Sequence, residues 1–288
     1  MKNLLLASLA LSFSLTATAQ RLNADLYAGI ANYNGDLQGK RLSFNNAGPE
    51  VGLGLSYNIT NKLAVRGAGT YLRISGSDAS GSSDKSTLNT RNLSFKSSVW
   101  EAQLALEYTF LDLEERSISP YVFAGIAAFH FNPYAKDSAG NKVFLRTLGT
   151  EGQGLSQYPD KQPYKNNQFA IPFGGGLKFA LNSRTQLGIE LGLRKLFTDY
   201  LDDVSGTYAD SSILAAARGP QAAAFAFRGR EINTGASYPA EGSIRGNAKN
   251  KDWYYTTGIK ISYNLGSGAG NGGGSGRKNR TGCPTNIY

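Results

Sequence analysis

The chain has 288 residues, among them 35 Gly, 16 Tyr and 14 Phe, and a formal net charge of +9. A single Cys excludes a disulfide-stabilised scaffold. After the N-terminus no apolar run approaches the ~18 residues that a membrane-spanning helix needs, which excludes a helical membrane protein. The cations are scattered rather than gathered on one stripe, so we expect no nucleic acid partner. Attraction to anionic lipid headgroups is the more natural consequence of the charge.

Residues 1–19 have the three parts of a signal peptide. Lys2 supplies the positive start, 4–15 form the apolar segment, and Ala17-Thr18-Ala19 is a small-residue cleavage motif. The apolar run is too short for an anchor helix. We therefore expect an exported protein that begins at Gln20, with a net charge of +8 once Lys2 is removed.

Eight later segments alternate apolar with polar or small residues, which is the pattern of β-strands. They are 22–33, 49–60, 63–74, 95–111, 120–131, 167–181, 184–197 and 252–265. In the second segment, for example, Val51, Leu53 and Leu55 alternate with Glu50 and Gly52. A charged second face does not suit the core of a soluble β-sandwich. Strands of about ten residues, apolar on one face only, are typical of transmembrane β-barrels.

The connections between these segments alternate strictly between long and short. Residues 61–62, 112–118 and 182–183 are short connections, whereas 34–48, 75–94, 132–166 and 198–251 are long. Outer-membrane barrels have short periplasmic turns and long extracellular loops. The sequence therefore predicts an all-β fold over residues 20–265: an eight-stranded antiparallel transmembrane up-and-down β-barrel in the outer membrane, with both termini periplasmic.

Charged residues fall on the face predicted to line the lumen, and several aromatic residues fall near strand ends. The predicted lumen residues are Glu50, Arg66, Glu101, Gln103, Glu107, Lys178, Glu190, Arg194 and Lys260. Eight strands leave an interior that side chains fill, so we expect a salt-bridge network and not a pore. The aromatic residues expected in headgroup-level belts are Tyr57, Tyr108, Phe110, Tyr121, Tyr255 and Tyr263.

Catalytic and cofactor signals are weak. His130 is the only histidine, and a barrel enzyme acting on lipid or peptide would need it near a nucleophile and an acid such as Ser205 and Asp199. No motif places these residues together. Gly149–Gly154 resembles a phosphate-binding loop but lacks a following Lys and a strand-to-helix context. We predict a non-enzymatic protein without a cofactor.

The longest connection begins with the acidic residues Asp199, Asp202, Asp203 and Asp210. Clustered carboxylates can bind Ca²⁺, but their spacing does not match an EF-hand loop. Arg91, Arg146 and Arg194 offer salt-bridge partners instead, and we favour that interpretation over a metal site. The Ala-rich stretch 212–227 can be either a short helix or a disordered segment.

Residues 266–288 form a predicted periplasmic tail with a Gly/Ser-rich composition that ends in a Cys-Pro motif. The flexible part, 266–282, has an r.m.s. reach of roughly 20–25 Å. This flexible part leads to Cys283. Cys283 either forms an intermolecular disulfide, acts as a reactive thiol, or has no role.

Six stretches resemble one family: 28–37, 66–79, 91–95, 119–133, 146–155 and 197–208. The last two read RTLGTEGQGL and FTDYLDDVSGTY. With the Cys-Pro tail, they resemble the PorG-like outer-membrane β-barrel proteins of the Bacteroidetes type IX secretion and gliding-motility machinery. The resemblance implies a non-enzymatic barrel. It would anchor periplasmic ring subunits, including a lipoprotein, to the outer membrane. The alternative is a barrel enzyme acting on lipid or peptide through its external loops.

Overall fold

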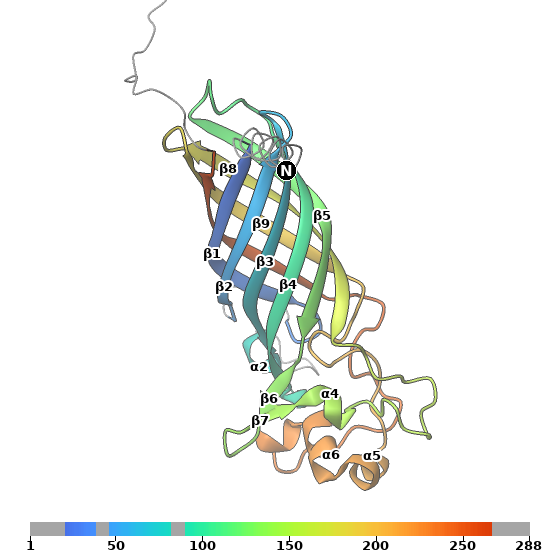
Figure 1. Cartoon of the computed structure of the whole chain (residues 1–288). Coiled ribbons are helices and arrows are strands. Elements are labelled where there is room, and N and C mark those ends of the chain that lie inside the picture. The colour runs from blue at the N-terminus through green and yellow to red at the C-terminus, as the bar shows by residue number, and fades with distance from the viewer. Residues whose placement is uncertain (1–20, 39–45, 82–89, 267–288) are drawn as a thin grey trace, which may run out of the picture.

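The computed structural model describes residues 21–38, 46–81 and 90–266. The predicted signal peptide and Cys283 lie outside these ranges. Eight long antiparallel strands form the body of the molecule (Figure 1). They are β1 (Leu22–Asn34), β2 (Gly48–Asn58), β3 (Leu63–Ser77), β4 (Ser94–Thr109), β5 (Ile118–Phe131), β8 (Asn167–Ala180), β9 (Thr185–Leu196) and β10 (Trp253–Asn264).

The sheet closes on itself. Each of the eight strands pairs with its neighbour in the chain, and β1 pairs with β10 from Asn23↔Asn264 to Asn34↔Trp253. The β5–β8 ladder is interrupted opposite Pro172, which has no N–H to donate. The predicted eight-stranded antiparallel β-barrel is confirmed, with strand ends displaced by at most three residues.

Side-chain hydrogen bonds fix the turns at the rim where the described chain begins and ends. Thr60 Oγ1 accepts from the backbone N of Leu63 at 3.0 Å, and Asn182 Oδ1 accepts from the N of Thr185 at 2.8 Å. Such short polar side chains compete well for backbone donors, which is why they occur in tight turns. The N of Leu265 donates to the O of Leu22 at 2.9 Å, so the two described ends meet at this rim.

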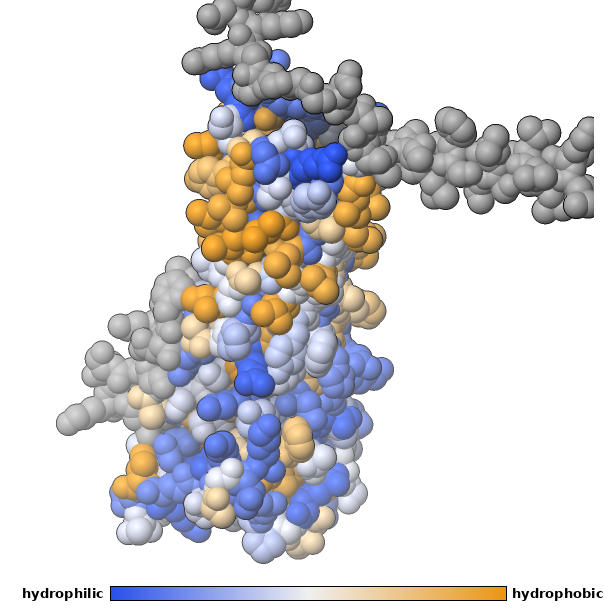
Figure 2. Space-filling model, turned by 60° about the vertical axis from the view of Figure 1, so that its left-hand side comes forward, coloured by the Kyte–Doolittle hydropathy of each residue, from blue (hydrophilic) through white to orange (hydrophobic). Residues whose placement is uncertain are grey.

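An apolar band covers the outer surface of the barrel nearest this rim. In Figure 2 it lies over the upper half of the molecule, and the lower half is largely hydrophilic. The exposed side chains include Leu53, Leu55, Leu104, Leu106, Ile126, Ile189, Leu191, Ile259 and Ile261. On β4, exposed Tyr108 and Trp100 bound the band. Eight residues of strand separate them, about 27 Å along the strand, which for a strand tilted by about 40° spans roughly 20 Å of the hydrocarbon layer.

Two of the six predicted belt aromatics are buried. Tyr121 points into the lumen and is 1% exposed, because the outward face of β5 is Val122, Ala124 and Ile126. Its four aromatic residues fill the interior instead. Tyr255 lies on the outward face of β10 but is only 5% exposed. Tyr57, Tyr108, Phe110 and Tyr263 are exposed as predicted.

The long connections fold into a second layer at the other end of the barrel, which we call the cap (Figure 1). It comprises the described residues of the four long connections. Their elements are α2 (Asp78–Gly81), β6 (Tyr134–Lys136), β7 (Lys142–Phe144), α4 (Leu145–Leu148), α5 (Ser211–Arg218), α6 (Pro220–Ala226) and the 3-10 helix η1 (Gly229–Glu231). The Ala-rich stretch 212–227 thus forms two short helices. Across the described ranges, no helix is long and apolar enough to span a membrane.

Candidate functional site

The first group of buried charges lies deep in the barrel, around Glu107. Arg66 Nη1 contacts Glu107 Oε2 at 3.1 Å and Glu190 Oε2 at 2.6 Å, while Arg66 Nη2 donates to Glu190 Oε1 at 3.0 Å. Lys260 Nζ donates to Glu107 at 2.6 Å, and Lys178 also pairs with it. We call Arg66, Glu107, Tyr121, Lys178, Glu190 and Lys260 the Glu107 cluster. Buried charges are stable only when paired and hydrogen-bonded.

Aromatic rings complete this cluster. Tyr121 donates its hydroxyl hydrogen to Glu190 Oε2 at 2.8 Å, and the Arg66 guanidinium lies 3.6 Å from the ring centroid of Phe123. The inward aromatic face of β5 therefore supplies a hydrogen-bond donor and a cation–π surface. The same two rings occupy lumen volume that water would otherwise fill.

A second group of buried charges lies around Arg194, nearer the cap. Arg194 Nη2 contacts Glu101 Oε1 at 3.1 Å and Glu50 Oε1 at 4.0 Å, and Nη1 donates to Thr256 Oγ1 at 2.7 Å. Tyr254 donates to Glu101 as well. We call Glu50, Glu101, Arg194, Tyr254 and Thr256 the Arg194 cluster. The structure places all eight predicted lumen charges in these two clusters, and their four cations balance their four carboxylates.

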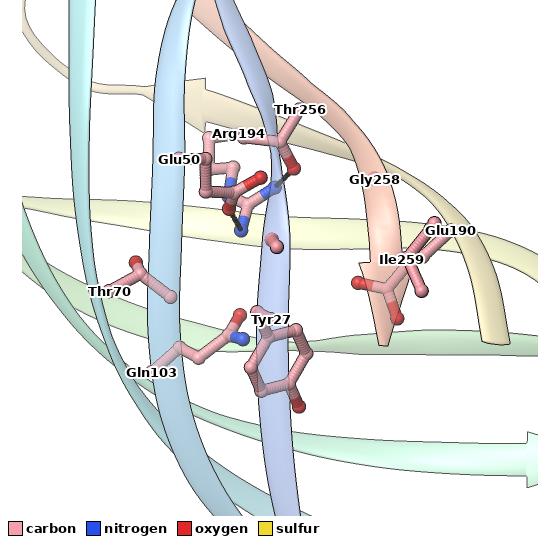
Figure 3. Close-up of a pocket in the computed structure, with 10 residues that line it drawn as sticks. Tyr27, Glu50, Thr70, Gln103, Glu190, Arg194, Thr256, Gly258 and Ile259 are labelled. Atoms are coloured by element: carbon pink, nitrogen blue, oxygen red, sulfur yellow. Dashed lines mark hydrogen bonds and ion pairs between the residues drawn. The ribbon is translucent and has the colours of Figure 1, made fainter. Parts of the chain in front are cut away.

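A cavity of about 10 Å³ remains between the clusters (Figure 3). Thr70, Gln103, Tyr27 and Arg194 line it. Thr70 Oγ1 and Gln103 Oε1 have no protein hydrogen-bond partner among the described residues. This volume and these polar atoms suit about one water molecule. The lumen is therefore packed between the two clusters, which leaves no continuous passage for a solute, and its wider part is a space of about 700 Å³ at the short-turn rim, lined by Asn23, Thr109 and Lys178 among others.

The cap has its own buried ion-pair network. Arg245 Nη1 donates to Glu151 Oε1 at 2.9 Å and to the backbone O of Asp203 at 2.6 Å. Glu151 also accepts from the backbone N of Ser205 at 2.9 Å. Thr150 and Tyr164 donate to the two carboxylate oxygens of Asp203 at 2.6 and 2.8 Å. These contacts bind the connection after β5 to the connection between β9 and β10.

The other two long connections join the same network through Arg91. Its guanidinium makes a bidentate contact with Asp78, at 3.1 Å from Nε and 2.7 Å from Nη2. Arg91 also donates to the backbone O of Asp36 at 3.0 Å and to that of Arg245. Bidentate arginine contacts combine strength with fixed geometry. All four long connections are therefore interlocked.

The cap is also continuous with the barrel through one hydrophobic core. Tyr33, Phe95 and Phe131 at the barrel mouth belong to the same buried cluster as Leu148 and Leu201 in the cap. Tyr33 donates its hydroxyl hydrogen to Asp202. The cap and the mouth are therefore packed as one unit.

Burial raises the pKa values of several carboxyl groups in the cap. It raises the pKa of Asp199 to about 7; the nearby Ser205 hydroxyl opposes the rise, and the Asp36 and Glu151 carboxylates add to it. Burial also raises the pKa of Asp203 to about 6, opposed by Arg245. The pKa values of Asp202 and Asp252 rise well above their ordinary range for the same reason.

The acidic residues considered as a possible Ca²⁺ site do not share a ligand position, and three of them have different protein partners. Asp202 accepts from Tyr33, Asp203 contacts Arg245 at 3.9 Å, and Asp210 caps α5 by accepting from the N of Ser212 and Ile213. Within the described ranges, no three His, Cys, Asp or Glu side chains are grouped to hold a metal ion.

The prediction that Arg91, Arg146 and Arg194 form salt bridges with these acidic residues is wrong. Arg91 pairs with Asp78, Arg146 donates to the backbone O of Tyr164, and Arg194 lies in the lumen. Among the described residues, Asp203 is the one of these acids with an ion-pair partner, Arg245 at 3.9 Å. No sequence pattern marked Arg245, because it comes from a remote part of the longest connection.

The candidate catalytic residues do not meet. His130 is exposed on the outer side of β5, where its Nδ1 lies 2.7 Å from Asn167 Oδ1. Ser205 and Asp199 are both buried in the cap. The Gly149–Gly154 stretch is also structural, with Gly149, Gly152 and Gly154 at positive φ and Glu151 fully buried between them.

The model of one protein family, described as a domain of unknown function (DUF6089), matches residues 2–218. The chain belongs to the DUF6089 family. The matched part of this DUF6089 protein holds seven of the eight barrel strands, whereas β10, which closes the barrel, and Arg245 lie beyond it. No protein with a curated description matches the sequence.

Solved structures with a similar arrangement include Neisserial surface protein A, at 9% identity and a TM-score of 0.40, covering 84% of this chain and 96% of that one. OprG from Pseudomonas aeruginosa matches at 10% identity and a TM-score of 0.40, covering 85% and 97%. Ail of Yersinia pestis matches at 11% identity and a TM-score of 0.39, covering 84% and 96%. For this DUF6089 protein, the barrel fold itself rests on its closed strand pairing.

Proposed function

We propose that the protein is a non-enzymatic outer-membrane component of a type IX secretion and gliding machinery, which anchors periplasmic ring subunits to the outer membrane. The observation that carries this proposal is the filled lumen, because a barrel whose interior is packed with paired charges serves as a fixed anchor and not as a conduit. The choice of the type IX secretion and gliding machinery is based on the resemblance of six sequence stretches to PorG-like proteins.

The positions of those six stretches in the fold support a shared architecture. They include Tyr33 and Asp36, Asp78 and Arg91, and the segment 146–155 with Glu151. All of these residues take part in the interlocked cap. In this chain, the stretches that carry the resemblance therefore build the interlocked cap, which we place outside the cell.

The same orientation places the short-turn rim in the periplasm. The barrel ends there at Leu265, so the tail with Cys283 would extend from that rim toward periplasmic partners. We propose that ring subunits, among them a lipoprotein, bind at the tail and turns, and that Cys283 forms an intermolecular disulfide with one of them.

The test is a non-reducing immunoblot of intact envelopes that compares wild type with Cys283→Ser, and with Thr281→Ser as a matched tail control. We expect a reducible high-mass band in wild type and Thr281→Ser that is absent in Cys283→Ser, and mass spectrometry should identify a periplasmic ring subunit in it.

A second variant tests anchoring without the disulfide. Deletion of residues 267–288 should leave the barrel in the outer membrane but abolish co-purification of ring subunits. Monomer bands alone in every variant would remove the disulfide. Unchanged co-purification after the deletion would overturn the anchoring role of the tail.

A further inference from the structure

Four exposed cations gather on one outer face next to the apolar band. Arg73 on β3, Lys96 on β4, Lys136 on β6 and Lys142 on β7 belong to one continuous sheet, because β3 pairs with β4, β4 with β6 and β6 with β7. All four are exposed on the outward face. We call them the basic cluster. It lies on the cap side of Trp100, four residues of β4 beyond it, or about 13 Å along the strand.

The positive charge of the basic cluster is not neutralised by carboxylates of the described residues. None of its four cations forms an ion pair within the part of the chain that the structure describes. The nearest carboxylate in sequence, Asp137, accepts from the N of Ala139 and from Asn141 within its own turn. By contrast, the cations of both lumen clusters are paired with carboxylates.

Two of the lysines face each other directly. Lys136 and Lys142 are register partners across β6 and β7, with side chains on the same face. Like charges in this position destabilise a hairpin. An anion bound between them would convert this repulsion into attraction.

Aromatic residues contact two of the four cations, Arg73 and Lys142. Arg73 Nε donates to the Tyr71 hydroxyl at 2.9 Å, which leaves both terminal nitrogens of the guanidinium free to bind a phosphate. Lys142 Nζ lies 4.8 Å from the ring centroid of Tyr134. Tyr71 and Trp100 pack with ring centroids 4.7 Å apart, at the edge of the apolar band.

An apolar groove lies on the outer wall between Gly69, two residues before Tyr71 on β3, and Tyr57 near the short-turn rim. Its space is about 750 Å³, and Leu53, Leu55, Val65, Gly67 and Gly69 line it. A Cβ at Gly69 would meet no atom within 4 Å, and one at Gly67 would meet only the backbone O of Gln103 at 3.9 Å. Gly69 shares the outward face of β3 with Tyr71 and Arg73. The groove is therefore aligned with the basic cluster.

We propose that the basic cluster and the groove together bind a phosphorylated, acylated glycolipid of the outer leaflet. The phosphate lies among Arg73, Lys96, Lys136 and Lys142, and one acyl chain lies over Gly67 and Gly69. The proposal uses only the orientation given above, with the cap outside the cell, and does not depend on ring subunits or on Cys283.

The test measures binding of bis-phosphorylated lipid A to the purified full-length protein in non-ionic detergent. The triple variant Lys96→Gln, Lys136→Gln, Lys142→Gln removes three charges of the cluster. Its matched control, Lys62→Gln, Arg116→Gln, Arg184→Gln, removes three exposed charges at the opposite rim. We expect at least about tenfold weaker binding in the first variant, wild-type binding in the second, and weaker binding at high salt.

Two further arms separate the phosphate from the acyl chain. Dephosphorylated lipid A should bind weakly to wild type, and Gly69→Leu, which fills open space, should weaken binding of the phosphorylated lipid severalfold. Equal binding by both triple variants, or equal affinity for dephosphorylated lipid, would overturn the proposal. Displacement by inorganic phosphate at the same affinity would overturn the lipid as its source and leave a free-phosphate site.

Discussion

Glu107 is the single residue on which most of the lumen charge depends, because it accepts from Arg66, Lys178 and Lys260. Glu107→Gln leaves these three buried cations with only the Glu190 carboxylate. Removing one partner of a buried ion pair typically costs about 3–5 kcal/mol. We therefore expect Glu107→Gln to lower the free energy of unfolding by at least about 3 kcal/mol, measured by urea denaturation in detergent.

Two comparison variants make this result specific to the network. Glu114→Gln makes the same chemical change in an exposed turn and should shift stability by less than about 0.5 kcal/mol. Adding Lys260→Met to Glu107→Gln removes one of the unpaired cations and should restore part of the loss. If Glu107→Gln and Glu114→Gln were equally mild, the cluster would contribute little to stability.

At the scale of elements, the cap should respond to pH separately from the barrel. Burial raises the folded pKa of Asp199 to about 7, above the ordinary aspartate value of 3.8. The folded state then binds more protons than the unfolded state between these two values, so stability falls as pH rises through about 7. We expect cleavage of the cap by a protease to accelerate between about pH 5 and about pH 8.

Asp199→Asn should remove this part of the pH dependence and stabilise the cap by about 1–2 kcal/mol at pH 8, allowing for partial solvation. Asp160→Asn, in an exposed loop, is the matched control and should retain the wild-type profile. Cleavage rates should be normalised at each pH to an unstructured peptide. A wild-type rate that falls as pH rises would contradict the expected sign.

The strands could be predicted from the sequence because their signal is local. Alternation along β2 or β4 identifies a strand and its two faces without knowledge of its neighbours. The lumen residues followed from the same alternation once a closed barrel was assumed. Tyr121 was misplaced because β5 has aromatic residues on one face and small or aliphatic residues on the other, and hydrophobicity alone cannot say which face meets lipid.

The cap could not be predicted in the same way, because its contacts are remote in sequence. Arg245 meets Glu151 across 94 residues, and Tyr33 meets Asp202 across 169. No periodicity links such positions. The acidic run around Asp202 was visible as a feature, but its partners were set by how four connections fold over one mouth.

For the whole molecule, the packed lumen predicts the absence of conductance. The Glu107 cluster and the Arg194 cluster leave only a cavity of about 10 Å³ between them, and the interlocked cap covers the barrel mouth. An ion crossing the barrel would have to displace paired charges, which costs several kcal/mol for each ion left unpaired. Wild-type protein in a planar lipid bilayer should therefore show no steady single-channel steps.

A variant with an emptied lumen provides the positive control for the absence of conductance in the wild type. Arg66→Gly with Tyr121→Ala removes two large inward side chains and should produce small, noisy conductance if it folds. Leu104→Ala with Val122→Ala removes two outward side chains and should remain silent. Steady steps in the wild type would contradict a packed lumen. Silence in wild type with conductance in the emptied variant would mean that side chains, and not barrel diameter alone, close this protein to solutes.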